Sequence, residues 1–240
     1  MIPLRDANPT RSRPLVTYGL IAACVAVFAL ELSRQWTGGD RALAQLVTTW
    51  GIVPAELVDA LGSGQVTSPE IATLVTSQFL HADWLHIGGN LLFLWIFGNN
   101  VEDRFGRFGF LVFYLVGGIV AGLAQVAIAP DSTVPTIGAS GAIAATLGAY
   151  LVLYPAARVT SLVFLVFFYQ LIDVPAIIVL ALWFVLQLVD GLASLGGPGM
   201  GSGGGIAFFA HIGGFLFGAA VAALVRSRSG LVGPTRRPVG

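Results

Sequence analysis

A serine and a histidine that lie far apart in the sequence have the clearest chemical potential in this chain. Ser140 follows Gly138 and Ala139 at the predicted start of an apolar helix, and His211 lies within a later apolar segment. A serine hydroxyl hydrogen-bonded to a histidine ring nitrogen forms the nucleophile and base pair of acyl transfer. The N-terminus of the helix would also place partial positive charge where negative charge develops.

Two further polar residues share one face of a predicted helix. His86 and Asn90 are four positions apart, and both side chains can donate hydrogen bonds. Acyl transfer needs such donors for its oxyanion, and the backbone N–H of Ser140 supplies a third. The acidic residues nearest to the inside of a predicted span, Glu31 and Asp173, both lie near helix ends. The sequence therefore favours a Ser–His dyad over a triad with an acid.

The composition shows what surrounds these residues. The chain has 240 residues, of which 56% are hydrophobic and 10% charged, and its mean hydropathy is +0.85. A soluble domain carries about 25% charged residues, so this composition indicates an integral membrane protein. Twelve basic residues, all arginine, balance twelve acidic ones, and no basic field favours nucleic acid as a partner. The single Cys24 excludes an intramolecular disulfide and a multi-cysteine metal site.

Six apolar segments are candidates for membrane-spanning helices, since a span needs about 20 apolar residues. They predict an all-α integral membrane protein with a six-transmembrane-helix bundle over residues 15–226, a polar segment 1–14 and a tail 227–240. Between the fourth and fifth segments, Thr160 to Gln170 is expected to lie in the membrane interface. The segments are Leu15 to Leu32, Trp84 to Gly98, Phe108 to Ala129, Ser140 to Tyr154, Asp173 to Leu192 and Ile206 to Val225.

The distribution of arginine predicts the orientation. With both termini cytoplasmic, ten arginines fall in inner segments and only Arg34 and Arg41 in outer ones. This positive-inside bias favours six spans. The long loop Ser33 to Asp83 and the glycine-rich loop Leu195 to Gly205, which cannot hold a helix, would then face outward. Neither a soluble domain nor the internal repeat typical of many transporters is found.

The fourth segment predicts a site below the outer membrane surface. From Ser140 to Tyr154 a helix is about 22 Å long, roughly 8 Å shorter than the hydrocarbon core. Irregular backbone before Ser140 would be tolerated there only inside protein or beside water. Small residues beginning at Gly141 could face the GxxxG pair Gly214 and Gly218 in the sixth segment. Such packing lets backbones approach closely and could bring Ser140 to His211.

Three sequence pieces resemble one known family. They are HADWLHIGGN at 81–90, GASG at 138–141 and AHIGGFLFG at 210–218. Together, in this order, they resemble the rhomboid intramembrane serine proteases from about Gln78 to Gly218.

The resemblance implies a nucleophile at Ser140, a general base at His211, and oxyanion donors at His86, Asn90 and the Ser140 N–H. It implies a structural role for His81, and loops at 33–83 and 195–205 that control substrate entry.

Two features depart from the family pattern. Some members carry an aromatic residue four positions after the serine that stacks on the catalytic histidine, and here that residue is Ala144. His211 must therefore be oriented by other contacts. The Trp-Arg pair that many members have in the first loop is also missing. Neither departure touches the residues expected to act in catalysis.

Other classes fit less well. Three histidines could ligate a metal or haem, but no acidic or cysteine ligand accompanies them and HExxH is missing. Non-catalytic relatives that bind membrane segments generally lose the serine or the histidine, and this chain has both. The expectation is an intramembrane serine endopeptidase that needs no cofactor or metal, acts on transmembrane protein substrates and contacts membrane lipid. An arginine-only composition suggests a bacterial inner membrane.

Overall fold

The computed structural model describes residues 1–64, 67–165, 168–194 and 204–229. This part of the chain is mostly helical and contains one small sheet. The helices are α1 (Leu15–Trp50), α2 (Pro54–Gly62), α3 (Pro69–Thr76), the 3₁₀ turn η1 (Ser77–Phe79), α4 (Trp84–Phe105), α5 (Arg107–Ile128), α6 (Ser140–Leu153), α7 (Ala176–Ser194) and α8 (Gly204–Ser229). The strands are β1 (Ile2–Asp6), β2 (Arg158–Leu165) and β3 (Phe168–Pro175).

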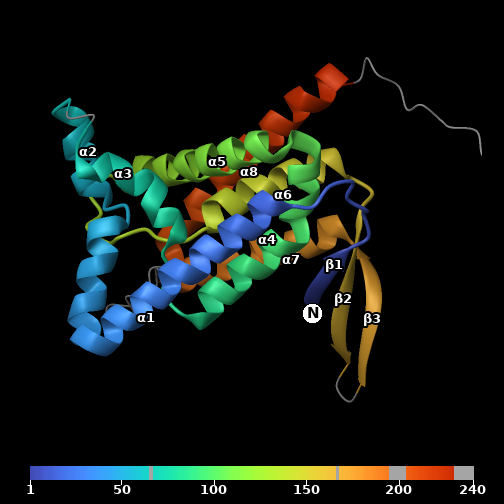
Figure 1. The fold of residues 1–240 in the computed structure, drawn as a ribbon, viewed down its shortest axis with the longest axis horizontal. Helices are drawn as coiled ribbons and strands as arrows, with labels where there is room; N and C mark the ends of the chain where they lie inside the picture. The colour runs from blue at the N-terminus through green and yellow to red at the C-terminus, as the bar shows by residue number, and fades with distance from the viewer. Residues whose placement is uncertain (65–66, 166–167, 195–203, 230–240) are drawn as a thin grey trace, which may run out of the picture.

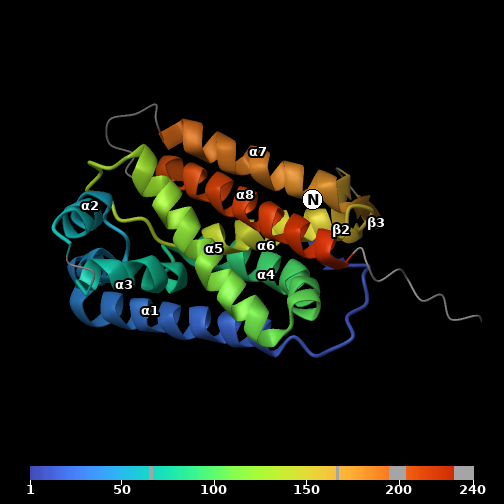
Figure 2. The same cartoon turned by 90° about the horizontal axis from the view of Figure 1, so that it is seen from above.

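Helix α6 lies in the middle of the bundle and packs against α4, α5 and α8 (Figures 1 and 2). Every residue from Gly141 to Tyr150 is buried. A helix that is apolar on all sides, as this one is, is stable only when it is surrounded. The residue at its N-terminus, Ser140, is therefore held by a helix that is enclosed by its neighbours.

The backbones of α6 and α8 approach closely because glycines line their contact. A Cβ on Gly218 would overlap the carbonyl oxygen of Ala145, and one on Gly214 would overlap that of Gly141. In the other direction, a Cβ on Gly148 would overlap the carbonyl oxygen of Phe215. Small residues allow this kind of packing between membrane helices, which have no hydrophobic driving force of their own. The contact brings the start of α6 beside α8.

The apolar helices identify a multi-pass membrane protein. Three stretches of the described residues are long and apolar enough to cross a membrane: Leu15–Trp50, Arg107–Ile128 and Phe208–Ser227. Ser140–Leu153 and Ala176–Leu186 are shorter apolar helices. Many large apolar side chains on these helices are exposed, as lipid-facing residues must be.

The predicted boundaries of the first helix and of the loop after it were wrong. Helix α1 extends beyond Leu32 to Trp50 as two helical parts that meet at Gly39, whose φ of +67° breaks the helical geometry. Most of the expected loop 33–83 is also helical, because α2 and α3 follow. Each of these two helices begins with a proline, Pro54 or Pro69, which fits the first helical turn since it needs no N–H there.

The small sheet corrects the all-α prediction. Strands β2 and β3 pair antiparallel from Arg158↔Pro175 to Leu165↔Phe168, and β1 pairs antiparallel with β2. Thr160 to Gln170, expected to lie in the membrane interface, falls mostly within this hairpin, and α7 begins at Ala176 rather than Asp173. The segment is rich in β-branched and aromatic residues, which suit a strand as well as an apolar helix. The sheet extends from the bundle at the end opposite α2 and α3 (Figure 1).

Other boundaries shift by less. Helix α4 runs on to Phe105 rather than ending at Gly98, and α8 begins at Gly204, so the last two residues of the expected glycine loop are helical. The remainder of that loop, 195–203, and the tail from 230 to 240 lie outside the described residues.

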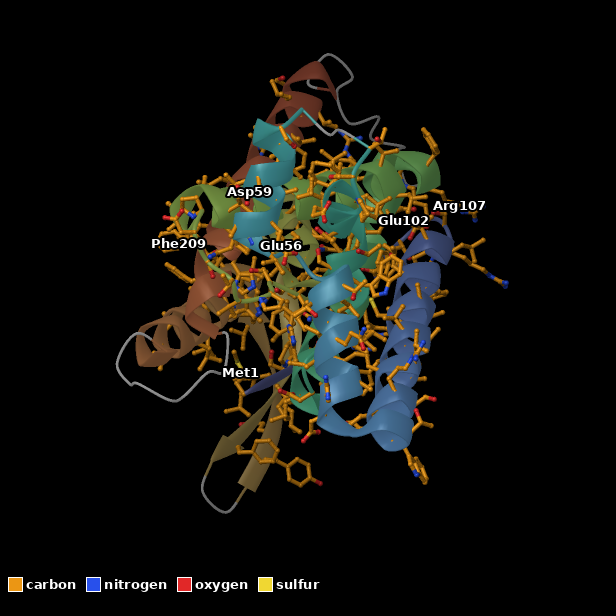
Figure 3. All side chains as sticks on the ribbon, turned by 90° about the vertical axis from the view of Figure 1, so that its left-hand side faces the viewer. Met1, Glu56, Asp59, Glu102, Arg107 and Phe209 are labelled. Atoms are coloured by element: carbon orange, nitrogen blue, oxygen red, sulfur yellow. The ribbon has the colours of Figure 1, made fainter. Side chains whose placement is uncertain are left out.

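Two acidic residues at the end of α4 hold the segment that leads into α1. The Glu102 carboxylate accepts hydrogen bonds from the backbone N–H of Val16 (3.0 Å) and Thr17 (2.7 Å) and from the Thr17 hydroxyl (2.8 Å). Glu102 therefore caps the N-terminus of α1, whose own N-cap position offers no side-chain bond. Figure 3 labels Glu102 beside the first turns of α1. Next to it, Asp103 accepts from the backbone and hydroxyl of Ser12.

A third acidic residue, Asp6, ties β1 to the bundle. Its carboxylate accepts from the side-chain amides of Asn100 (2.6 Å) and Asn8 (3.2 Å) and from the Tyr150 hydroxyl (3.0 Å). Burial raises the pKa of Asp6 above its ordinary value, although the hydrogen bonds from Tyr150 and Asn8 oppose this. The first strand is thus held by α4 and α6 as well as by β2.

Candidate active site

Ser140 and His211 meet where α6 packs against α8. The Ser140 hydroxyl oxygen lies 2.6 Å from Nε2 of His211. His211 is 3% exposed, and its Nδ1 is buried without a hydrogen-bond partner among the described residues. Nε2 can accept the serine proton when the ring carries its own proton on Nδ1. This is the geometry of a nucleophile and base without a third orienting acid.

The segment before Ser140 is held by main-chain hydrogen bonds to the chain between α1 and α4. Thr136 exchanges two backbone bonds with Ile52, of 2.7 and 3.0 Å, and the Gly138 N–H donates to the carbonyl oxygen of Ser77 at 2.9 Å. Gly138 has a φ of +126°, which favours glycine. The irregular backbone that enters α6 is therefore fixed by backbone pairing from within the protein.

The His86 ring lies close to Gly138. A Cβ on Gly138 would lie 2.8 Å from Nε2 of His86 and 3.5 Å from the Ser140 hydroxyl oxygen, so the two side chains flank the same glycine. The Ala82 N–H donates to Nδ1 of His86 at 3.3 Å. Because Nδ1 accepts, the ring proton is on Nε2, which is thus a donor. Asp83 caps this end of α4 by accepting from the His86 N–H at 2.9 Å.

Asn90 lies one helical turn beyond His86 and is 8% exposed. Its side-chain nitrogen is buried and has no hydrogen-bond partner among the described residues. A buried amide without a partner destabilises a protein by about 1–3 kcal/mol. Such an atom is expected where it serves a ligand or an intermediate. Asn90 therefore offers a second unused donor on the face of α4 that carries His86.

His81 lies beside the site but is engaged in structural contacts. Its backbone N–H donates to both carboxylate oxygens of Glu31, at 3.1 and 3.2 Å, and its Nδ1–H to the carbonyl oxygen of Phe79 at 3.1 Å. The His81 ring also packs 5.2 Å from the ring of His86. Glu31, one of the two acids weighed above as a partner for His211, thus connects α1 to the turn before α4. The other, Asp173, accepts from Thr160 in the sheet.

Sequence reasoning missed two parts of this site. The pairing of the loop at 136–138 with residues 52 and 77 uses only main-chain atoms, so it leaves no sequence signal. The second part is Trp183 on α7, whose ring lies 5.3 Å from that of His211. Nothing distinguishes Trp183 in the sequence from other aromatic residues of apolar helices. Ala144, where the family sometimes has an aromatic residue, is fully buried in α6.

The histidines of the site make separate polar contacts. Within the described ranges, no three His, Cys, Asp or Glu side chains come together as metal ligands would. Each of the three histidines has a different hydrogen-bond partner, namely Phe79 for His81, Ala82 for His86 and Ser140 for His211, although the rings of His81 and His86 are in contact. The site thus places a serine hydroxyl against a histidine ring nitrogen, with side-chain donors on the neighbouring α4.

Comparison with known proteins identifies the family. Residues 68–228, more than half of the chain, match the Rhomboid domain. The chain belongs to the rhomboid family. The match includes the loop before α4, the start of α6 and the part of α8 that carries His211.

Several curated rhomboid proteins are similar to this one. It is 32% identical over 139 residues to rhomboid protease GluP of Bacillus subtilis, covering 58% of this chain and 24% of that protein. It is 30% identical over 157 residues to the mitochondrial Rhomboid protein 1 of Saccharomyces cerevisiae, covering 62% and 39%. It is 45% identical over 69 residues to the chloroplastic Rhomboid-like protein 11 of Arabidopsis thaliana, covering 29% and 24%. These matches span about a quarter to two fifths of the relatives' lengths.

Proposed function

We propose that this rhomboid protein is an intramembrane serine endopeptidase that cleaves transmembrane segments of other proteins. The observation that carries the proposal is the 2.6 Å contact between Ser140 and a buried His211, with unused donors nearby. The similarity to a Bacillus rhomboid protease adds support.

In the first half of the reaction, Nε2 of His211 takes the proton of the Ser140 hydroxyl. The serine oxygen attacks the scissile carbonyl carbon and forms a tetrahedral intermediate. The oxyanion accepts hydrogen bonds from Nε2–H of His86, from the Asn90 amide and from the Ser140 N–H. That backbone N–H has no acceptor within the helix, because Ser140 is the first residue of α6.

In the second half, the protonated Nε2 of His211 donates its proton to the leaving amine, and the peptide C–N bond breaks. A water molecule, deprotonated by the same nitrogen, then attacks the acyl-enzyme ester. Ser140 recovers its proton from His211 as the carboxylic acid product is released. The same oxyanion donors serve both halves, and no step requires a metal or an organic cofactor.

The topology belongs to the same proposal. We assign spans to α1, α4, α5, α6, α7 and α8, with both termini cytoplasmic, which follows the arginine distribution. The protease domain is then 15–226, with a cytoplasmic segment 1–14 and a tail 227–240. The proposed setting is a bacterial cell membrane, where lipid and transmembrane protein substrates are the partners. A substrate helix must unwind locally to present its carbonyl groups, and it is cleaved near its outward end.

Cleavage of a reporter transmembrane substrate by the purified, reconstituted protein tests this function. We expect the wild type to cleave, and both Ser140→Ala and His211→Ala to lose about 10³-fold or more in kcat. A chelator should leave the wild-type rate unchanged. A fluorophosphonate should label the wild type at Ser140 and leave Ser140→Ala unlabelled.

Cleavage that survives Ser140→Ala would overturn the mechanism. Wild-type protein that neither cleaves the reporter nor reacts with the fluorophosphonate would instead favour a rhomboid protein that binds membrane segments without cutting them.

A further inference from the structure

His211 has only one hydrogen bond to orient its ring. Nε2 contacts the Ser140 hydroxyl, and Nδ1 has no partner in the described part of the chain. In a triad, a carboxylate bound to Nδ1 holds the imidazole in its reactive orientation. A ring attached at one nitrogen can still turn about its side-chain bonds, so another contact must restrain it.

We infer that Trp183 is the positioning residue for His211, and that its indole ring replaces the missing acid as the restraint on the imidazole. The two ring centroids are 5.3 Å apart and the planes are inclined at 53°. At this distance the rings are in contact, and the tilt brings the edge of one toward the face of the other. The inference rests on the proposed function, since positioning matters only if His211 acts as the base.

Trp183 is itself fixed by neighbours from two helices. Its ring lies 5.9 Å from Phe93 on α4 and 5.1 Å from Phe184, the next residue on α7. Phe184 packs edge-to-face with Phe215 on α8 at 4.9 Å. A ring restrained from α4 and by a neighbour on α7 that is itself packed against α8 can transmit that restraint to His211, whereas a freely rotating side chain could not.

The contact between Trp183 and His211 is favourable for both the neutral and the protonated form of His211. While His211 is neutral, the indole limits its rotation and keeps Nε2 on the serine. When His211 takes the proton, an aromatic ring within about 6 Å favours the cation that forms. A displacement of about 1 Å in a catalytic group can lower a rate by about 100-fold. The restraint is therefore expected to appear in kcat and less in the apparent affinity for substrate.

The test compares Trp183→Leu with Trp183→Phe in the reconstituted full-length protein. Leucine keeps an apolar side chain but has no ring, and phenylalanine keeps a ring face. We expect Trp183→Leu to lower kcat about 10- to 100-fold with KM changed by less than about threefold. Trp183→Phe should stay within about threefold of the wild type in both constants. The rate of fluorophosphonate labelling at Ser140 should fall with kcat, because labelling also requires an activated serine.

Trp95→Leu is the matched control. Trp95 lies on α4, is 52% exposed and stacks on Tyr18 rather than on any residue of the site. It should retain the wild-type kcat and labelling rate, which shows that the loss of a bundle tryptophan alone is harmless.

Two results would overturn the inference. The first is a Trp183→Leu protein that labels at the wild-type rate, because His211 would then be oriented without the indole ring. A changed KM in that protein would mean that Trp183 contacts substrate instead. The second is a Trp183→Phe protein as impaired as Trp183→Leu, because a ring face would then not be the restraint. Wild-type protein that fails to label would mean that the proposed function has failed, which is a distinct outcome.

Discussion

Polar groups at the two ends of the helix bundle differ in how fully they are hydrogen-bonded. At the end away from the site, the carboxylates of Asp6, Glu102 and Asp103 each accept two or more hydrogen bonds. At the end with the site, Asn90 and His211 each keep a buried nitrogen that has no partner among the described residues. The bundle thus has one end, at β1 and the end of α4, where bonded carboxylates hold the fold, and another, where α4 and α8 keep buried nitrogens available for chemistry.

Among the changes that test this difference between the two ends, the largest effect is expected from removing the unpaired donor of Asn90. Asn90→Ala should lower kcat by about 10²–10³-fold, because the oxyanion loses one of its donors. The stability of the protein should change little, since the side-chain nitrogen that is removed has no hydrogen-bond partner among the described residues. Reporter cleavage and SDS-induced unfolding, measured on the same preparation, check both halves of the prediction. An Asn90→Ala protein that is fully active, or that unfolds more readily than the wild type, would show that Asn90 serves stability rather than catalysis.

Removing a hydrogen-bonded carboxylate at the end away from the site should lower stability rather than activity. Glu102→Ala removes three hydrogen bonds to a buried carboxylate and uncaps α1. We expect a loss of about 2–3 kcal/mol in the free energy of unfolding. The kcat of the folded fraction should remain within about twofold of the wild type, since the site is distant. A matched variant, Glu102→Gln, keeps one acceptor oxygen and should lose less. A Glu102→Ala protein with normal stability and a much lower kcat would contradict the assignment.

The smallest expected effect is a pH dependence of the local stability of β1, caused by Asp6. Burial raises the pKa of Asp6, so its stabilising contribution is fully present below the ordinary carboxyl pKa and is lost as pH rises through the raised value. Hydrogen exchange of the β1 amides should therefore quicken as pH rises above the ordinary carboxyl pKa, beyond the intrinsic pH dependence, by less than about tenfold. Asp6→Asn has no charge to bury and should not show this additional increase. An equal increase in both proteins would exclude Asp6 as the cause.

Sequence reasoning identified the family and the membrane setting because both depend on local patterns. The three motifs and the apolar runs are short stretches of chain, and the Rhomboid domain match confirms the family. The sequence also predicted that glycines at 214 and 218 would let α8 approach α6, and the structure places Ser140 and His211 in contact there.

The rest required long-range contacts that sequence periodicity does not encode. The sheet was missed because Val163 and Phe164 suit a strand and a membrane helix equally, and only the pairing with β3 and β1 decides between them. The contact between Trp183 and His211 joins α7 to α8 and depends on how the two helices pack. The boundary of α1 was wrong because hydropathy marks where a helix leaves the apolar region, and here the helix continues into a polar stretch.

The loop that carries Gly138 has a consequence for how this protein can evolve. The bonds that fix it, from Ile52 to Thr136 and from Ser77 to Gly138, join only main-chain atoms. Substitution changes side chains and leaves main-chain N–H and C=O groups in place for every residue except proline. The segment between α1 and α4 can therefore exchange most of its side chains while continuing to hold the serine, so long as the path of its backbone is kept. Side-chain changes there would leave the main-chain support of the serine in place.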